Sequence, residues 1–463
     1  MYERYHLSTA PAKLLSTRIG KLKITRSNKC LNCGRCKTAC IYDVHERDAG
    51  DPRKMADPVS ELCKGCFACI QNCPQQALSM ERNPASEVLG NAYWTPHIIH
   101  TAWNEAEEGR LPIYGAGYGG RFKGEGFDAI WTDMSEIVRP TRDGIHGREY
   151  ISTLVDLGRK LPYISDFDDP GVPRCLQSCV PVLLDANPLG LNSKAVALAV
   201  VKAAHRVGSF AFLDAENYGP AVEEYFGSLI LRAPIVQIIS SEKNVPWNDA
   251  KVIEILLAPD FPIPELGGTL DRFKERNETV LISLGISDPR VSPAIFPLFE
   301  EKRADILHFY ADSCGRSLSD NSFVSDTAKT LHREFVRAQR RDEITIIGSG
   351  GLAAAEHVPK LIICGADAVV LDVALLVSMG CRVCEFCDFE RCPAGIGTLD
   401  PGLAEQRLVN LISAWRDQLL EVLSAMGIRD VRRLRGEMGR AMFYEEIEKE
   451  AFGFIFERNG PPK

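Results

Sequence analysis

The sequence lacks any apolar segment long enough to cross a membrane. No stretch approaches the roughly 18 uncharged apolar residues of a transmembrane helix, and the first residues, MYERYHLSTAPAKLL, contain no apolar export-signal core. Excess positive charge is lacking too, because the formal net charge is −8 and no basic block offsets it. We therefore expect a cytoplasmic protein with no membrane span and no nucleic-acid partner.

Cysteine, in contrast, is abundant: the 463 residues include 16 cysteines. Disulfides need an oxidising compartment, and without an export signal we expect reduced thiols that bind metal clusters. Hydrophobic residues make up 45% of the chain, which is enough for one large core plus a small domain.

Eight of the cysteines form two copies of one spacing near the N-terminus. Each copy reads C-x2-C-x2-C-x3-C, the run that holds [4Fe–4S] clusters in bacterial two-cluster ferredoxins, where the fourth cysteine ligates the other cluster. Zinc is the alternative for paired CxxC elements, but this run crowds three ligands into one loop, which does not suit a tetrahedral site. The expected crossed assignment is Cys30, Cys33, Cys36 and Cys73 for one cluster, and Cys63, Cys66, Cys69 and Cys40 for the other.

Composition and motifs divide the chain into five expected parts. They are an N-terminal arm (1–25), a two-[4Fe–4S] ferredoxin-like α+β domain (26–80), a connecting region (81–165), a barrel (166–400) and a C-terminal helical segment (401–463). The connecting region contains a nominal dinucleotide motif at 115–120, but no helix opens after it, so we expect a turning loop. Three arginines at 139–148 could bind an anion or form a solvated surface.

From about residue 180, short apolar runs alternate with amphipathic helical segments. One expected helix runs from Ser193 to Arg206, with Asn192 or Ser193 as its cap and Gly208 at its end. Eight alternations predict an α/β fold, a closed (β/α)8 TIM barrel, with an open doubly wound sheet as the alternative. The expected strands are 181-PVLLDA, 210-FAFLDA, 235-IVQIIS, 252-VIEILLAP, 279-TVLISLGI, 304-ADILHFYAD, 344-ITIIGSG and 368-AVVLDVALL.

Function in a barrel lies at the C-terminal ends of the strands. Glycines follow the seventh expected strand, at 348–351, and such turns let backbone N–H groups approach an anion beside a helix N-terminus. These glycines alone are equally consistent with ordinary turns. The residues expected at the strand ends are Asp185, Asn187, Asp214, Ser240, Pro259, Asp312, Gly348 and Asp372.

A further cysteine loop, at 379–398, follows the last expected strand and reads Cys381-x5-Cys387-x4-Cys392-Pro393. Together with SGGL at 349–352 and GADAVVLD at 365–372, this loop resembles the cluster loop of the glutamate synthase family over roughly 130–440. A ferredoxin module before such a barrel resembles the short archaeal-type subunit of that family. The resemblance implies a [3Fe–4S] cluster on Cys381, Cys387 and Cys392, and Cys384 either completes a [4Fe–4S] cluster or remains a spectator.

The resemblance also implies FMN at the C-terminal mouth of the barrel. FMN carries a single phosphate, which suits a barrel cradle, whereas the chain has no credible dinucleotide fold. Of the other cysteines, we expect Cys175 and Cys179 to be structural, Cys364 to lie in the core, and Cys314 to lie at the functional rim. The expected FMN contacts are Asn187, Pro188, Leu189 and Gly190 near the ring, and Gly348, Ser349, Gly350, Gly351, Gly365, Ala366, Asp372 and Val373 near the phosphate.

Two departures from the family concern the substrate. No cysteine precedes Cys30, so the glutaminase nucleophile of full-length members is missing and ammonia would come from a separate subunit. The family's lysine-containing loop, G-A-K-P-G-x-G-G, is replaced by a stretch with Pro259, Asp260 and Glu265, and its glycine-rich loop after the sixth strand by Asp312-Ser-Cys-Gly. A lost cation removes charge-assisted hydrogen bonds to a dicarboxylate.

Two functions follow as hypotheses. The first is a ferredoxin-linked FMN oxidoreductase of the glutamate synthase type. The second is an electron-transfer subunit with no glutamate-forming activity of its own. In both, the expected partners are redox proteins, either ferredoxin or other subunits of an electron-transfer complex.

Overall fold

The computed structural model describes residues 5–110, 126–132, 150–158, 175–240, 245–258, 263–384, 387 and 392–443. The glycine-rich turn at 115–120, the arginine stretch at 139–148, and Pro259 and Asp260 lie outside the described residues. No helix in these ranges combines the length and apolar character of a membrane span.

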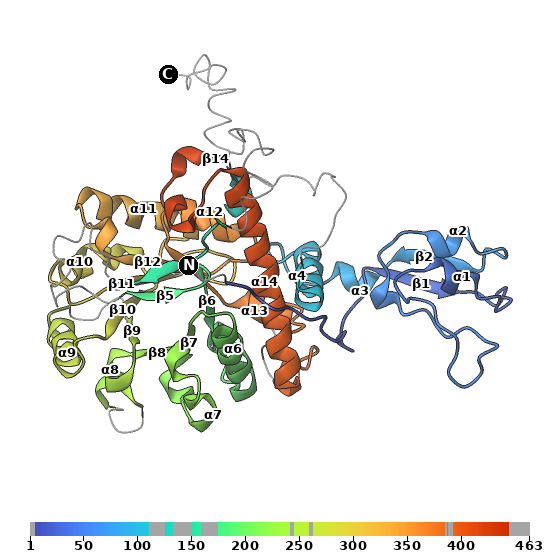
Figure 1. Cartoon of the computed structure of the whole chain (residues 1–463), viewed down its shortest axis with the longest axis horizontal. Coiled ribbons are helices and arrows are strands. Elements are labelled where there is room, and N and C mark those ends of the chain that lie inside the picture. The colour runs from blue at the N-terminus through green and yellow to red at the C-terminus, as the bar shows by residue number, and fades with distance from the viewer. Residues whose placement is uncertain are drawn as a thin grey trace, which may run out of the picture.

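Eight parallel strands close into a barrel, which confirms the (β/α)8 prediction (Figure 1). The last strand pairs with the first, with Val369 opposite Val182, so the open-sheet alternative is excluded. The strands, each neighbouring the next around the ring, are β6 (Val182–Asp185), β7 (Ala211–Asp214), β8 (Leu229–Pro234), β9 (Val252–Leu257), β10 (Leu281–Ile286), β11 (Ile306–Tyr310), β12 (Thr345–Ser349) and β13 (Ala368–Leu371).

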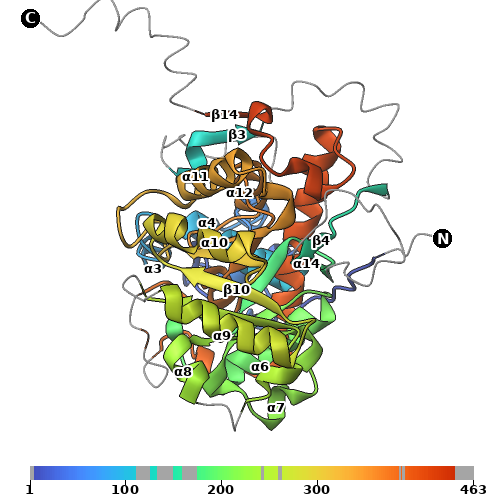
Figure 2. The ribbon, with the colours of Figure 1, turned by 90° about the vertical axis from the view of Figure 1, so that its left-hand side faces the viewer.

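Helices cover the outside of the barrel (Figure 2). The helix expected at 193–206 is present: the Ser193 hydroxyl accepts a hydrogen bond from the Val196 N–H at 3.4 Å, and Gly208 follows with φ 62°. The helices after the strands are α6 (Lys194–Arg206), α7 (Pro220–Glu223), α8 (Ile235–Ser240), α9 (Ile263–Arg276), α10 (Ser292–Glu300), α11 (Val324–Arg337), α12 (His357–Ile363) and α13 (Val373–Ser378).

One expected strand is wrong. Residues 235–240 form helix α8, and the third strand is the preceding segment, β8. Short apolar runs do not distinguish a strand from a helix by periodicity, and Arg232 interrupts the apolar run of β8. That arginine is only 6% exposed, because its charge is paired inside the barrel. Ser240 therefore ends a helix, and Pro234 ends the third strand.

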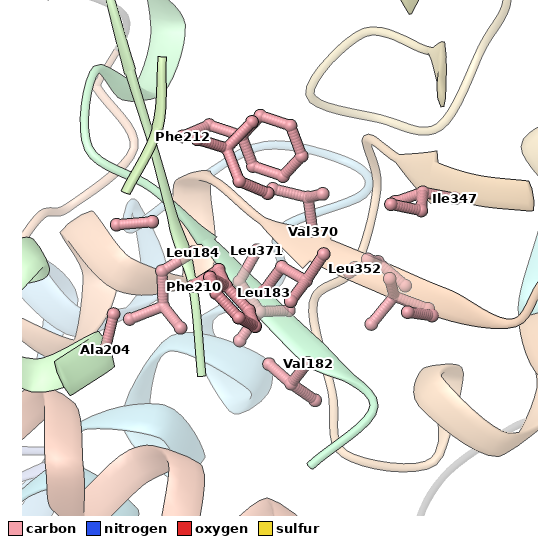
Figure 3. Packing of buried hydrophobic residues seen from close by; sticks show 14 of the residues in the cluster. Val182, Leu183, Leu184, Ala204, Phe210, Phe212, Ile347, Leu352, Val370 and Leu371 are labelled. Carbon is pink, nitrogen blue, oxygen red and sulfur yellow. The ribbon is translucent and has the colours of Figure 1, made fainter. Parts of the chain in front are cut away.

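The barrel core is one continuous cluster of aliphatic and aromatic side chains. Figure 3 shows part of it, where Leu184 and Phe210 lie near Ala204 of α6. Short antiparallel pairs lie outside the barrel sheet: β4 (Val155–Leu157) with β5 (Leu176–Ser178), and β3 (Ile130–Thr132) with β14 (Ala441–Phe443).

The N-terminal module lies to one side of the barrel (Figure 1). Strand β1 (Leu22–Arg26) pairs antiparallel with β2 (Leu78–Arg82), and the cysteine loops between them carry α1 (Arg35–Ala39) and α2 (Ala68–Gln71). Its core is separate from that of the barrel and small. The buried members are Ile24, Cys36, Val44, Met55, Cys69 and Leu78.

A helical pair connects the module to the barrel. After α3 (Pro84–Glu87), helix α4 (Pro96–Glu108) packs against α14 (Pro401–Ala425). The buried Arg407 guanidinium lies 3.4 Å from Glu107, and Arg18 of the N-terminal arm pairs with the same carboxylate. The arm, α4 and α14 are therefore joined by buried charge pairs, which require all three elements to be in place.

Candidate functional site

The first predicted cysteine set converges on one pocket of the N-terminal module. Cys30, Cys33, Cys36 and Cys73 all line it, so the fourth cysteine of the second run lies with the first three of the first run. Backbone N–H groups point at the sulfurs, with Ala77 N 3.2 Å from Cys73 Sγ. Burial opposes ionisation of Cys73, but these backbone hydrogen bonds outweigh it and lower the pKa of the thiol.

The second predicted set shows the reciprocal arrangement. Burial raises the pKa of Cys69 to about 11, and the neighbouring thiols of Cys63, Cys40 and Cys66 add to that shift. Cys40, the fourth cysteine of the first run, is thus placed with the second run. Both crossed groups of four are brought together by the fold, and their role as cluster ligands stays a prediction.

The described Cys, His, Asp and Glu side chains form no group of three placed to hold a single metal ion. Each of the two crossed groups supplies four thiols, which is the donor set of a [4Fe–4S] cluster.

The third cysteine loop begins directly after α13. Burial raises the pKa of Cys381 to about 12, and Cys384, Cys392 and Cys387 all lie close enough to raise it further. Cys384, the cysteine that exceeds the family pattern, is therefore a neighbour of the predicted ligand Cys381. Val383 turns the loop with φ 51°, rare for a β-branched residue, and its N–H donates to Cys381 Sγ at 3.3 Å.

Two N-terminal segments hold this third loop. The Arg382 guanidinium donates to the Thr17 carbonyl at 2.6 Å, and the Thr17 hydroxyl donates to the Ala394 carbonyl at 3.4 Å. From the segment that follows the N-terminal module, the Gly90 N–H donates to the Arg382 carbonyl at 3.0 Å. The third loop is thereby connected to both ends of the chain segment that carries the first two cysteine sets.

The glycines after β12 form a tight cradle at the C-terminal mouth. Gly350 has φ 99° and Gly351 has φ 70°, and an added Cβ would lie 2.5 Å from the Ala311 oxygen or from Gly315 Cα, respectively. The Tyr93 hydroxyl donates to the Gly351 carbonyl. Only glycine fits both positions, because the backbone of residues 311–315 lies directly against them.

Two of the expected phosphate contacts are at the wrong end of the barrel. Gly365, with φ 122°, closes the turn after α12, and Ala366 precedes β13 at its N-terminal end. The Gly365 carbonyl instead accepts a hydrogen bond from Arg341 at 2.6 Å. In contrast, Gly348 and Ser349 end β12, and Asp372 and Val373 follow β13, all at the C-terminal mouth. The length of β13 separates Gly365 and Ala366 from Asp372 and Val373. The two pairs are close in sequence, so the sequence alone did not show that they lie at opposite ends of the barrel.

The turn after β6 places a free donor at the mouth. Asn187 is 1% exposed, and its side-chain oxygen accepts a hydrogen bond from the Asp214 N–H at 2.9 Å. Its Nδ2 is buried with no partner among the described residues. Pro188, Leu189 and Gly190 complete the turn, in which Leu189 has φ 59°. An unpaired buried amide is costly, and a bound acceptor would satisfy it.

A buried ion-pair network inside the barrel was not predicted from the sequence. The Arg232 guanidinium donates to Asp214 at 2.7 Å and to both oxygens of Asp185 at 2.9 and 3.1 Å. Burial disfavours its charge, but Asp185 and the other acidic neighbours raise the pKa of Arg232 well above its usual value. This cation is therefore fully engaged by two carboxylates.

A second network was also missed. Glu254 accepts hydrogen bonds from Ser283 at 3.1 Å and from the Tyr310 hydroxyl, and its Oε1 lies 2.7 Å from His308 Nδ1. Burial opposes ionisation of Glu254, but His308 and the other partners outweigh it and lower the pKa of the carboxyl. A signal was present in the sequence: each of these strands carries at least one polar residue within an apolar run.

Further carboxylates lie at the mouth. Burial raises the pKa of Asp372 to about 7, and the charges of Asp185 and Asp312 act in the same direction. The Asp312 carboxylate accepts hydrogen bonds from the N–H groups of Cys314 and Arg316, each at 2.8 Å. Cys314 is therefore held at the rim. Its predicted contact with a flavin or substrate stays a prediction.

The remaining cysteines are located as follows. Cys364 is buried in the barrel core, as expected. Cys175 and Cys179 flank β5, outside the three groups of predicted cluster ligands, and each is partly exposed.

Comparison with known proteins gives one consistent relationship. Residues 326–429 match the family described as the conserved region in glutamate synthase. The archaeal-type glutamate synthase (NADPH) of Dehalococcoides mccartyi is 25% identical over 92% of this chain and 94% of its own length. The archaeal glutamate synthase (NADPH) of Archaeoglobus fulgidus is 26% identical over 92% and 95%. Among solved structures, a flavocytochrome b2 variant aligns with a TM-score of 0.44 and 12% identity, over 67% of this chain and 75% of its own. The chain is thus similar to the archaeal-type glutamate synthases over nearly its whole length, and its main domain is a (β/α)8 barrel.

Proposed function

We propose that the protein is an iron–sulfur FMN oxidoreductase of the glutamate synthase type. It moves electrons between two [4Fe–4S] clusters in the N-terminal module, a third cluster at 381–392 and FMN in the barrel. The observation that carries this proposal is the crossed convergence of the cysteines, because Cys73 lies with the first set and Cys40 with the second. That crossing is the arrangement that two ferredoxin-type clusters require.

The barrel mouth has the groups that FMN needs. Gly350 and Gly351 have positive φ angles, and a glycine turn of this kind after a barrel strand can present backbone N–H groups to a phosphate. Asn187, after β6 at the same mouth, offers a buried unpaired N–H donor. Asp372 and Val373 begin α13 at the same mouth. FMN, when bound, exchanges two electrons with a substrate and single electrons with iron–sulfur clusters.

The contacts of the third cysteine loop support a continuous redox path. This loop follows α13, which starts at the mouth, and it is hydrogen-bonded to the segments on both sides of the N-terminal module. We assign the third cluster to Cys381, Cys387 and Cys392. Cys384 is the candidate fourth ligand of a [4Fe–4S] form, since it lies beside Cys381.

One observation favours the second function, an electron-transfer subunit that makes no glutamate. A dicarboxylate such as 2-oxoglutarate is recognised by charge-assisted hydrogen bonds from an available cation. Arg232 is not available, since its guanidinium already pairs with the carboxylates of Asp185 and Asp214. The proposed cluster and FMN sites do not depend on Arg232. A dicarboxylate in the barrel, in contrast, could not pair with Arg232, because that side chain is already paired with two aspartates.

Partners and location follow from the same chemistry. We infer that the protein exchanges electrons with ferredoxin or with other subunits of a redox complex, and that a separate subunit supplies any ammonia. Sixteen reduced thiols suit the cytoplasm.

Anaerobic purification tests the proposal. We expect non-covalent FMN, not FAD, and about eleven or twelve irons per chain from cluster arithmetic. A [3Fe–4S]+ signal in the oxidised protein would identify Cys384 as a spectator, and its absence would support Cys384 as a ligand. Recovery of FAD, or eight irons or fewer in fully loaded protein, would contradict the flavin or the third-cluster assignment.

Activity assays separate the two functions. The isolated chain is expected to form little or no glutamate from 2-oxoglutarate and ammonia, while it exchanges electrons with a reduced ferredoxin or a dye. Robust ferredoxin-dependent glutamate formation would instead restore the plain glutamate synthase function.

A further inference from the structure

The two cysteine sets lie at opposite ends of the β1–β2 hairpin. Leu22 pairs with Arg82 at one end, and both line a cavity of about 880 Å³ that also contains Cys63 and residues of α4. Arg26 pairs with Leu78 at the other end, and both line the pocket of the first cysteine set. A five-residue strand spans about 13 Å, so the two sets are separated along the hairpin.

The second set is the one beside the barrel. Lys64, which follows Cys63, donates to Asn104 of α4 at 3.2 Å and lies 3.7 Å from Glu108 of the same helix. The pocket of the first set, in contrast, is lined by no residue of α4 and shares no lining residue with that cavity. The first set therefore faces outward and the second faces the rest of the chain.

The outward end exposes an apolar residue surrounded by positive charge. Leu31 is 66% exposed and Cys33 is exposed, as are Lys29 and Arg35 on either side. Within the described residues, neither Lys29 nor Arg35 has a carboxylate oxygen within 4.0 Å of its charged nitrogens. From residue 26 to residue 40 the chain has four basic residues and no acidic one, although its net charge is −8. We call Lys29, Leu31, Cys33 and Arg35 the outer face.

We propose that the outer face is the docking surface for an acidic one-electron carrier protein, and that electrons pass first to the cluster of Cys30, Cys33, Cys36 and Cys73. This inference rests on the proposed function, since it needs that cluster. One electron leaves the reduced centre of the carrier and converts the oxidised [4Fe–4S]2+ cluster to [4Fe–4S]+. No bond or proton is transferred.

Charge complementarity explains the choice of partner. A protein of net charge −8 repels an acidic carrier over most of its surface, whereas Lys29 and Arg35 attract it at one place. Leu31, central in this group, supplies the apolar contact that a desolvated docking surface needs. From the outer cluster, the second set lies on the way toward α4 and the barrel.

Charge reversal is the direct test, with Lys29→Glu combined with Arg35→Glu. The matched control is Lys23→Glu combined with Arg333→Glu, which makes the same charge change at exposed residues of β1 and α11. The probe is an acidic bacterial two-cluster ferredoxin. We measure binding of the oxidised probe by calorimetry at low salt, and stopped-flow reduction of the clusters by the photoreduced probe.

The outer-face variant is expected to bind the probe at least about tenfold more weakly, to accept electrons correspondingly more slowly, and to lose most of the salt dependence. Reduction by a photoexcited neutral deazaflavin should be unchanged, and the control variant should stay within about twofold of the wild type. Leu31→Ala should weaken binding about threefold or more with its salt dependence retained.

Two outcomes would overturn the proposal: unchanged binding and reduction in the charge-reversed protein, or equal losses in the control. Loss on Phe67→Ala, beside Cys66, with none on Leu31→Ala, would move the docking surface to the second cluster. Failure of the proposed function is recognised separately, because the wild-type protein would then lack the iron and the visible absorption of the clusters.

Discussion

The N-terminal module and the barrel are stabilised in different ways. The barrel is built around one continuous apolar core, to which all eight strands contribute. The module has six buried core residues, and two of them, Cys36 and Cys69, are predicted cluster ligands. A domain this small rarely folds on apolar burial alone and commonly depends on metal binding. We infer that binding of the proposed clusters stabilises the module in place of a larger apolar core.

The largest expected effect separates the two regions directly. Cys36→Ser combined with Cys69→Ser removes one predicted ligand from each proposed cluster, so the module should lose its structure while the barrel keeps it. Hydrogen exchange should then be at least about a hundredfold faster in β1 and β2, with β6 to β13 unchanged. Cys364→Ser, in the barrel core, is the control and should leave β1 and β2 protected. Retained protection of β1 and β2 in the double variant would mean that the module folds without its clusters.

The next effect concerns the barrel alone. Arg232→Met leaves Asp185 and Asp214 buried without their counter-charge, and breaking such a pair costs about 3–5 kcal/mol. The free energy of unfolding of the barrel, from denaturant titration, should fall by this amount, while the module's cluster absorption at zero denaturant persists. Arg290→Met, which breaks an exposed pair with Asp288, should cost less than about 1 kcal/mol. Equal losses in the free energy of unfolding would show that the buried ion pairs stabilise the barrel no more than an exposed pair does.

A third effect tests the cradle at the mouth. Gly351→Ala places a methyl group 2.5 Å from Gly315 Cα at a positive φ, so the cradle must shift, and FMN affinity should fall by about tenfold or more. Gly427→Ala is the matched control, because Gly427 has a similar φ of 68° but nothing within 4 Å of the added methyl group. Quenching of flavin fluorescence measures both dissociation constants. Unaltered affinity in Gly351→Ala would place the FMN phosphate elsewhere.

The smallest expected effect is a pH dependence within the barrel. Burial raises the pKa of Asp372 to about 7, so the folded state binds this proton more tightly than the unfolded state does. Stability contributed by the protonated form is then lost as pH rises from the unfolded pKa of about 4 to about 7, and the loss is complete above that. Asp372→Asn removes the ionisation while keeping a helix-capping side chain. The stability of the flavin-free wild type relative to this variant should fall by about 1 kcal/mol or more between pH 5 and pH 7, as measured by denaturant titration. A difference that is flat with pH would assign the dependence to other groups.

Sequence analysis was most successful where the signal is local. The spacing C-x2-C-x2-C-x3-C is set within eleven residues, and the fold gathers those cysteines in the predicted crossed groups. The alternation of apolar runs and helices predicted seven of the eight barrel strands. It failed at β8 for two reasons. Arg232 lies within the apolar run of that strand, and the next residues, 235–240, form another short apolar run that is a helix in the structure.

The candidate flavin site was predicted in part, for a geometric reason. Glycines 350 and 351 and Asn187 follow strands directly, so their end of the barrel could be inferred from the strand direction alone. Gly365 and Ala366 precede their strand and therefore lie at the other end. Whether a glycine begins or ends a strand depends on element boundaries, which sequence patterns define least well.

By itself the sequence determined the kinds of chemistry available: two ferredoxin-type cysteine runs, a third cysteine loop, a glycine-rich turn and the β/α alternation that makes a barrel. The tertiary structure decided which of these meet. Pairing of β13 with β6 closes the barrel, and only then do Arg232, Asp185 and Asp214 share one interior. It also placed the first cysteine set outward and the second against α4. These outcomes depend on contacts between residues distant in the chain. Such contacts cost loop-closure entropy, and a buried charge needs its partner, so both costs are offset only in the complete fold.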